Sequence, residues 1–171
     1  QKILETPDER LYEEMRKNSL TSRTTEAQIP AWKKNITLLQ KWEHAYGSVD
    51  HYYQQYIDRD KKRKGLVAPG ISLIKTLSNP AKNNPNKLKQ MDVALVCEYL
   101  KNVGYDFPKP DTHIRRILGR DILGFSASRE ASPDQAIEIV FKLAGLTGKS
   151  AAETDYILWA YCADRYGEIC T

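Results

Sequence analysis

The helical character of this chain is clearest in one segment, residues 132–143, which reads SPDQAIEIVFKL. Ser132 and Gln135 have the spacing of a capping box, and Pro133 stands at the first helical position, where its missing N–H leaves no bond unmade. The residues that follow are apolar on most faces of a helix: Ile137, Ile139, Val140, Phe141 and Leu143. A helix with so little polar surface is expected to lie inside a core built of other helices.

Start and stop signals of the same kind recur toward the N-terminus. The run Thr6-Pro7-Asp8-Glu9 predicts a capping box and a helix that ends near residue 18. Pro30 is expected to begin a second helix, which Gly47 ends, and Ser48 to cap a third. A short helix over residues 70–77 should stop before Asn79-Pro80, because the residue that precedes a proline resists helical geometry.

The second half of the chain carries three further helix starts. Each is expected to be capped by a short polar side chain: Asp92, Asp111 and Ser150. These helices should run to about residues 103, 120 and 167, with residues 105–110 as an extended connector. No segment alternates apolar and polar residues in the manner of a strand. The sequence therefore predicts an all-α fold of about eight helices.

Composition narrows the class of protein. Hydrophobic residues make up 41% of the 171 positions and charged residues 28%, an ordinary balance for a globular chain. No apolar run approaches the roughly 20 residues that span a bilayer, and residues 1–10 are polar and acidic, so we expect no membrane segment, no signal peptide and a cytoplasmic location. The net charge of +4 permits nucleic-acid binding without requiring it.

Cysteine and histidine give no sign of a metal site. Cys97, Cys162 and Cys170 form no C-x-x-C pair, and the three histidines are scattered along the chain. We therefore expect no zinc ligation, and we interpret Cys97 and Cys162 as small buried apolar residues in a reducing compartment.

Two features of the first half allow two interpretations each. The basic run over residues 59–64 is either a solvated loop or a surface that faces phosphates. An aromatic series at helical spacing is typical of core packing, although it could also stack on a nucleobase: Trp32, Trp42, Tyr52, Tyr53 and Tyr56.

The segment Asp111–Gly119, DTHIRRILG, resembles the V-D-T-H-V-x-R-V-x-x-R block of the helix-hairpin-helix DNA glycosylases, the superfamily of endonuclease III and its adenine-, oxoguanine- and alkylpurine-excising relatives. Residues 88–95, LKQMDVAL, lie where that family places its hairpin and the start of the next helix, and residues 156–170 are similar to the end of its helical core. The resemblance implies a helix-hairpin-helix DNA glycosylase-like fold in which residues 71–171 form the core. Residues 1–70 would add N-terminal helices to the same 171-residue unit.

The same resemblance implies a function. Asp111 would be the catalytic carboxylate of an N-glycosylase that hydrolyses the bond between sugar and a flipped, damaged or mispaired base in double-stranded DNA. Residues implied to contact DNA are Lys87, Lys89, Gln90, Lys101, Lys109, His113, Arg115 and Arg116. For the cations among them, solvated surface charge is the competing interpretation, and for His113 a structural role.

The sequence departs from the family pattern at three places. Gln90 and Asp92 stand where the hairpin glycines belong, and Asp92 brings negative charge to a helix end that should hold a phosphate. Val93 and Ala94 occupy the positions of the lysine nucleophile of bifunctional members, so we expect a monofunctional enzyme that uses water. The four cysteines of an iron–sulfur loop are missing, so no cofactor is expected.

These departures leave two other functions open. The chain could be a glycosylase-fold protein that has lost catalysis and binds DNA or a protein partner. It could also be a helical interaction domain whose likeness around Asp111 is accidental.

Overall fold

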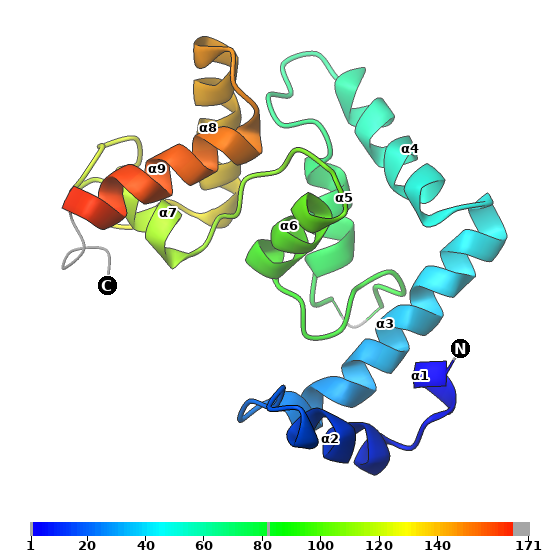
Figure 1. The fold of residues 1–171 in the computed structure, drawn as a ribbon. Helices are drawn as coiled ribbons and strands as arrows, with labels where there is room; N and C mark the ends of the chain where they lie inside the picture. The colour runs from blue at the N-terminus through cyan, green and yellow to red at the C-terminus, as the bar shows by residue number, and fades with distance from the viewer. Residues whose placement is uncertain (1, 82, 166–171) are drawn as a thin grey trace.

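The computed structural model describes residues 2–81 and 83–165, and all regular structure within these residues is helical (Figure 1). The prediction of an all-α fold is confirmed. The described residues form nine helices, one more than expected, because residues 2–5 add a short first helix. Their bounds are α1 Lys2–Glu5, α2 Asp8–Lys17, α3 Thr25–Tyr46, α4 Val49–Lys61, α5 Ile71–Ser78, α6 Val93–Asn102, α7 Thr112–Ile117, α8 Pro133–Thr147 and α9 Ala151–Arg165.

Most of the expected helix ends are confirmed. The Ser132 side chain accepts from the N–H of Gln135, whose own side chain returns to the Ser132 N–H, which completes the capping box of α8. Ser48 caps α4 through the His51 N–H. Gly47 follows α3 with a φ of 82°, the left-handed geometry that ends many helices. The predicted end near residue 167 lies outside the described residues.

Two predicted helix starts are wrong. The Thr6 hydroxyl donates to the Lys2 carbonyl instead of capping α2, so Pro7 takes the cap position without a side-chain bond. Helix α3 begins at Thr25 and carries Pro30 inside it. This early start is favoured because Thr25 and Ile29 are buried and the Thr25 hydroxyl accepts from the Ser22 N–H.

Helix α7 ends three residues earlier than predicted, at Ile117. The chain then turns into a tight loop in which the Arg120 N–H donates to the Ser128 carbonyl at 2.9 Å. A Cβ atom at Gly119 would lie 1.9 Å from the Arg129 carbonyl oxygen, so the two limbs of this loop are in backbone contact. The loop packs against α7 and takes the place of the predicted last turn.

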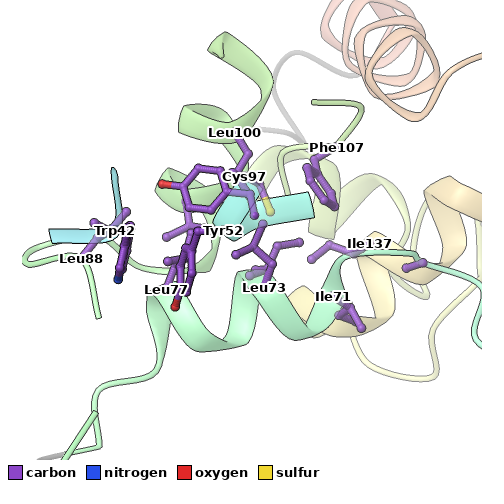
Figure 2. Packing of buried hydrophobic residues seen from close by; sticks show 14 residues of the cluster. Trp42, Tyr52, Ile71, Leu73, Leu77, Leu88, Cys97, Leu100, Phe107 and Ile137 are labelled. Carbon is purple, nitrogen blue, oxygen red and sulfur yellow. The ribbon is translucent and has the colours of Figure 1, made fainter. Parts of the chain in front are cut away.

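The larger core lies where α3, α4, α5 and α6 meet (Figure 2). Trp42 stacks on Tyr52 with ring centroids 4.4 Å apart, which confirms core packing for this part of the aromatic series. The same cluster takes in Cys97, which is buried as predicted, and Ile137 from α8. Residues from both sides of position 70 therefore share one core. The side chains of Cys162 and Cys170 lie outside the described residues.

A second, smaller core joins α7, α8 and α9. Its buried members are Ile114, Ile117, Leu118, Ala131, Ala136, Val140, Ala144 and Ala151. Phe141 packs against both cores, so α8 connects them. Figure 1 shows the result: α5 and α6 lie between the arm formed by α3 and α4 and the group formed by α7 to α9. Within the described residues, no helix is long and apolar enough to cross a membrane.

One buried carboxylate in the basic run 59–64 escaped the sequence analysis. The Asp60 side chain accepts from the Gly70 N–H at 3.1 Å and from the Ser72 N–H at 3.0 Å, and so caps α5 from ten residues upstream. The Arg59 guanidinium lies over the Tyr56 ring and donates to the Ser72 hydroxyl. Part of the basic run therefore serves the join between α4 and α5.

Gly70, at the join between α4 and α5, has little space around its Cβ position. It has a φ of 90°, and an added Cβ would lie 2.5 Å from Cζ of buried Phe107. We predict that Gly70→Ala lowers the free energy of unfolding by roughly 2–4 kcal/mol, because left-handed strain adds to overpacking. Gly47→Ala is the matched control, since Gly47 has a φ of 82° and open space around its Cβ position. Urea unfolding should show a smaller loss for this control, about 1–2 kcal/mol. Equal losses would contradict the role of Phe107.

Candidate active site around Asp111

Asp111 is held by the start of α7. Its Oδ1 accepts from the Ile114 N–H at 3.1 Å, while its own N–H donates to the Lys109 carbonyl at 2.8 Å. Pro110 before it is buried, so the connector reaches α7 with little freedom. The second oxygen, Oδ2, lies 4.0 Å from Nζ of Lys109, and 26% of the side chain is exposed. The carboxylate is thus fixed through Oδ1, while Oδ2 has only the long ion pair with Lys109 among the described residues.

Asp111 lines two hollows on the surface. The first, which we call the α6 hollow, encloses about 400 Å³ between the first turn of α6, Asp111, Arg115 and Pro133. The second, the α9 hollow, encloses about 200 Å³ and is lined by residues of α6 and α9, among them Asp155 and Trp159. Lys109 also belongs to both hollows. Asp111 therefore belongs to a site that small polar groups could enter from either side.

A second carboxylate lies in the α9 hollow. Asp155 is 5% exposed, and its Oδ1 has no hydrogen-bond partner. Its Oδ2 lies 3.6 Å from Nζ of Lys101, and that ammonium also pairs with Glu98 at 3.2 Å. Glu98 accepts a second cation, Lys109, at 3.7 Å. Three carboxylates thus share two ammonium groups around Asp111.

The excess of carboxylates over ammonium groups affects the protonation of Asp155. Burial is the largest cause that raises the pKa of Asp155, and the negative charge of Asp111 also raises it. The main chain of Lys109 and the ammonium of Lys101 lower it. The resulting pKa is about 6. The site can therefore hold a proton on Asp155 at mildly acidic pH.

The predicted hairpin, residues 88–92, leads directly into α6. Leu88 is buried, and its N–H donates to the Leu77 carbonyl. Gln90 has a φ of 55°, the left-handed geometry that favours glycine, at the position where the glycosylase hairpin carries one. The Asn35 side chain on α3 accepts from the Lys89 N–H at 2.6 Å and donates to the Lys89 carbonyl at 3.2 Å. The hairpin is therefore clamped to α3, and the Gln90 side chain adds a bond to the Ala27 carbonyl.

The charged residues at this hairpin have structural partners. Asp92 caps α6 by accepting from the Leu95 N–H at 2.9 Å. The Lys87 ammonium donates to the carbonyls of Ser78 and Met91, which ties the end of α5 to the hairpin. The Lys89 side chain is exposed.

The two arginines of α7, which the resemblance implies as DNA contacts, are bound within the protein. Glu130 pairs with Arg115 at 3.2 Å and with Arg116 at 3.0 Å, and the Arg115 Nε–H also donates to the Ala131 carbonyl. Both arginines thus hold the loop after α7 in place. His113 is half-buried on the same helix. The structure brings Lys101, Lys109 and Arg115 to the hollows of Asp111, and it places Lys87, Lys89 and Gln90 at the hairpin.

Sequence reasoning missed Asp155, Glu98 and Asn35. Asp155 is one of several acids on α9, and nothing in its spacing shows that it is buried. Asn35 bonds with a residue 54 positions away, and a single sequence carries no signal for such a contact. Within the described part of the chain, no three side chains of His, Cys, Asp or Glu come together as metal ligands.

Comparisons with known proteins give no further guidance, because no family model, no curated protein and no solved structure matches the chain.

We predict that Asp155→Asn stabilises the fold at neutral pH. The native carboxyl stays protonated up to about pH 6, whereas the unfolded one ionises near pH 4, so the stability of the native chain falls as pH rises through this window. The gain from Asp155→Asn should be small near pH 4 and on the order of 2 kcal/mol near pH 8.

Urea unfolding across this pH range measures the effect. Glu153→Gln is the control, since Lys149 holds the pKa of Glu153 below its usual value and its removal should not stabilise. A gain from Asp155→Asn that does not grow with pH would contradict the assignment.

Proposed function

We propose that this protein is a monofunctional DNA N-glycosylase with Asp111 as its catalytic carboxylate. The observation that carries the proposal is the position of Asp111, whose Oδ1 caps α7, whose Oδ2 lies 4.0 Å from the Lys109 ammonium, and whose side chain lines two hollows. The left-handed Gln90 and the capped start of α6 next to the α6 hollow support a hairpin in the place that the resemblance implies.

The chemistry fits a fixed, partly exposed carboxylate. Cleavage of the bond between base and sugar leaves positive charge on the sugar in an oxocarbenium-like transition state. A carboxylate that is already oriented stabilises this charge without reorganisation, and it can accept the proton of an attacking water. Asp111 would perform both tasks, while Asp155 and Glu98 add negative potential behind it.

The absence of a suitable amine favours water as nucleophile. Val93 and Ala94, at the positions of the lysine in bifunctional relatives, line the α6 hollow with apolar side chains. Lys109 is the one amine that the α6 hollow includes, and its ammonium faces Glu98 and Asp111.

A second candidate function is that of a glycosylase-fold protein without catalysis. The charged residues around the α6 hollow and on α7 support it. Arg115 and Arg116 are held by Glu130, and Asp92 places a negative charge beside the α6 hollow. A protein with these features would bind DNA or a partner without excising a base.

A base-release assay separates the two candidates. The substrates are duplexes that each contain one oxidised, alkylated, deaminated or mismatched base. We predict that at least one of these duplexes loses the altered or mismatched base, which alkaline cleavage at the abasic site detects. Asp111→Asn should lower the single-turnover rate by roughly a hundredfold or more. Asp106→Asn is the matched control, since Asp106 caps α9 through the N–H groups of Ala151 and Ala152 and lies outside both hollows. Release that survives in Asp111→Asn would exclude this residue as the catalyst, and release from no duplex would favour the second candidate.

The charge of Asp92 gives a separate prediction. Asp92→Asn keeps an oxygen for the Leu95 N–H and removes the negative charge from the start of α6. We expect duplex affinity to rise several-fold at low salt, because repulsion of the DNA backbone is relieved. Fluorescence anisotropy with a labelled duplex measures the affinity of the variant and of the unaltered chain. An unchanged affinity would place the start of α6 away from the DNA.

A further inference from the structure

A third hollow lies away from Asp111, between α3 and the loop of residues 83–89. It encloses about 470 Å³, and four lysines line it: Lys34, Lys41, Lys87 and Lys89. The other lining residues are uncharged, so no carboxylate contributes to the wall. We call it the lysine hollow. Lys34 and Lys41 are seven residues apart on α3, which places them on the same face of that helix.

These lysines differ from most others in the described chain. Lys33, Lys75, Lys101, Lys109 and Lys149 each pair with a carboxylate within 4.0 Å. Lys34, Lys41 and Lys89 are exposed and have no such partner among the described residues, and Lys87 is bonded to main-chain carbonyls. Four lysines without a carboxylate partner in the described part of the chain thus lie together at this hollow.

The repulsion within this group is visible at Lys87. Burial lowers the pKa of Lys87, and the positive charge of Lys89 lowers it further, while the negative charge of Asp92 raises it in part. An anion bound in the hollow would relieve this repulsion, so the site favours negative ligands.

The walls of the hollow are rigid, which suits a binding surface. The Asn35 clamp on Lys89 joins the two walls, and Leu38 packs against the larger core. The Trp42 ring nitrogen donates to the Asn86 side chain at 3.3 Å, which fixes the loop from below. The lysines therefore stand on a preformed frame.

Several helix N-termini, which attract anions, are already occupied by carboxylates of this chain: Asp60 at α5, Asp92 at α6, Asp111 at α7 and Asp106 at α9. These four helix starts are therefore unfavourable places for a DNA phosphate.

The lysine hollow is connected to the candidate active site. It shares Lys87 with a hollow of about 420 Å³ at the hairpin, and that hollow shares Asp92 and Val93 with the α6 hollow of Asp111. The three hollows are thus neighbours, with lysines at the α3 end and Asp92 and Asp111 at the other.

We propose that the lysine hollow binds the phosphate backbone of duplex DNA and replaces the hairpin helix as the anchor for the strand. The inference adopts the DNA partner of the proposed function, but it does not require that a base is released.

The test is the salt dependence of binding to a short undamaged duplex, measured by fluorescence anisotropy. Lys34→Gln/Lys41→Gln should weaken binding roughly tenfold near 0.1 M salt and reduce the slope of log K against log salt by about 2. Lys2→Gln/Lys142→Gln is the matched control, since it removes the same charge from two exposed lysines outside both the lysine hollow and the basic run 59–64. Lys34→Arg/Lys41→Arg should bind as the unaltered chain does.

The outcomes distinguish this inference from the proposed function. Loss of binding only in the lysine-hollow variant supports the anchor, whether or not any duplex releases a base. Equal losses of duplex affinity in both double glutamine variants would show that only net charge matters, and this would overturn the inference. The inference would also be overturned if the unaltered chain binds no duplex at low salt. Base release with unchanged binding in Lys34→Gln/Lys41→Gln would leave the proposed function intact and overturn the anchor.

Discussion

The hairpin before α6 is attached to α3 by one pair of hydrogen bonds, between the Asn35 side chain and the main chain of Lys89. This amide joins the long helix α3 to the hairpin before α6, 54 residues away, and buried Leu88 beside it anchors the same hairpin to α5. Both the lysine hollow and the start of α6 take their positions from this junction. A side-chain amide suits the task, because it can satisfy a donor and an acceptor of the irregular backbone at once.

The distribution of aspartates explains why charge is separated along the molecule. Four of them accept from N–H groups at helix starts, where a carboxylate lies favourably in the helix dipole. Two of the four, Asp92 and Asp111, meet at the α6 hollow, and Asp155 lies next to it in the α9 hollow. The lysines near Asp111 are outnumbered by acids, whereas the lysine hollow at α3 has four lysines and no carboxylate in its lining. The capping that stabilises the helices thus also sets where an anion can bind.

The sequence predicted what depends on neighbouring residues and missed what depends on distant ones. Ser48, Asp92, Asp111 and Ser132 were identified as caps, because a cap and its N–H partner are three residues apart. Helix α3 was started too late, since the burial of Ile29 in tertiary packing outweighs the usual place of a proline. Asp60 and Asp155 were not recognised, because their burial follows from chain segments that local patterns do not describe. Asp111 was selected by its motif, and the two hollows that it lines became apparent only from the geometry.

A displaced anion site also accounts for an otherwise unfavourable hairpin. Gln90 adopts the left-handed backbone that a glycine would adopt more easily, and its side chain compensates through the bond to the Ala27 carbonyl. Asp92 likewise exchanges a possible phosphate contact for a cap on α6. Both residues make contacts of the hairpin within the protein. If the backbone of DNA is held at α3 instead, the hairpin no longer needs bare N–H groups, and it can serve as the rigid bridge between the cationic hollow and the carboxylate of Asp111.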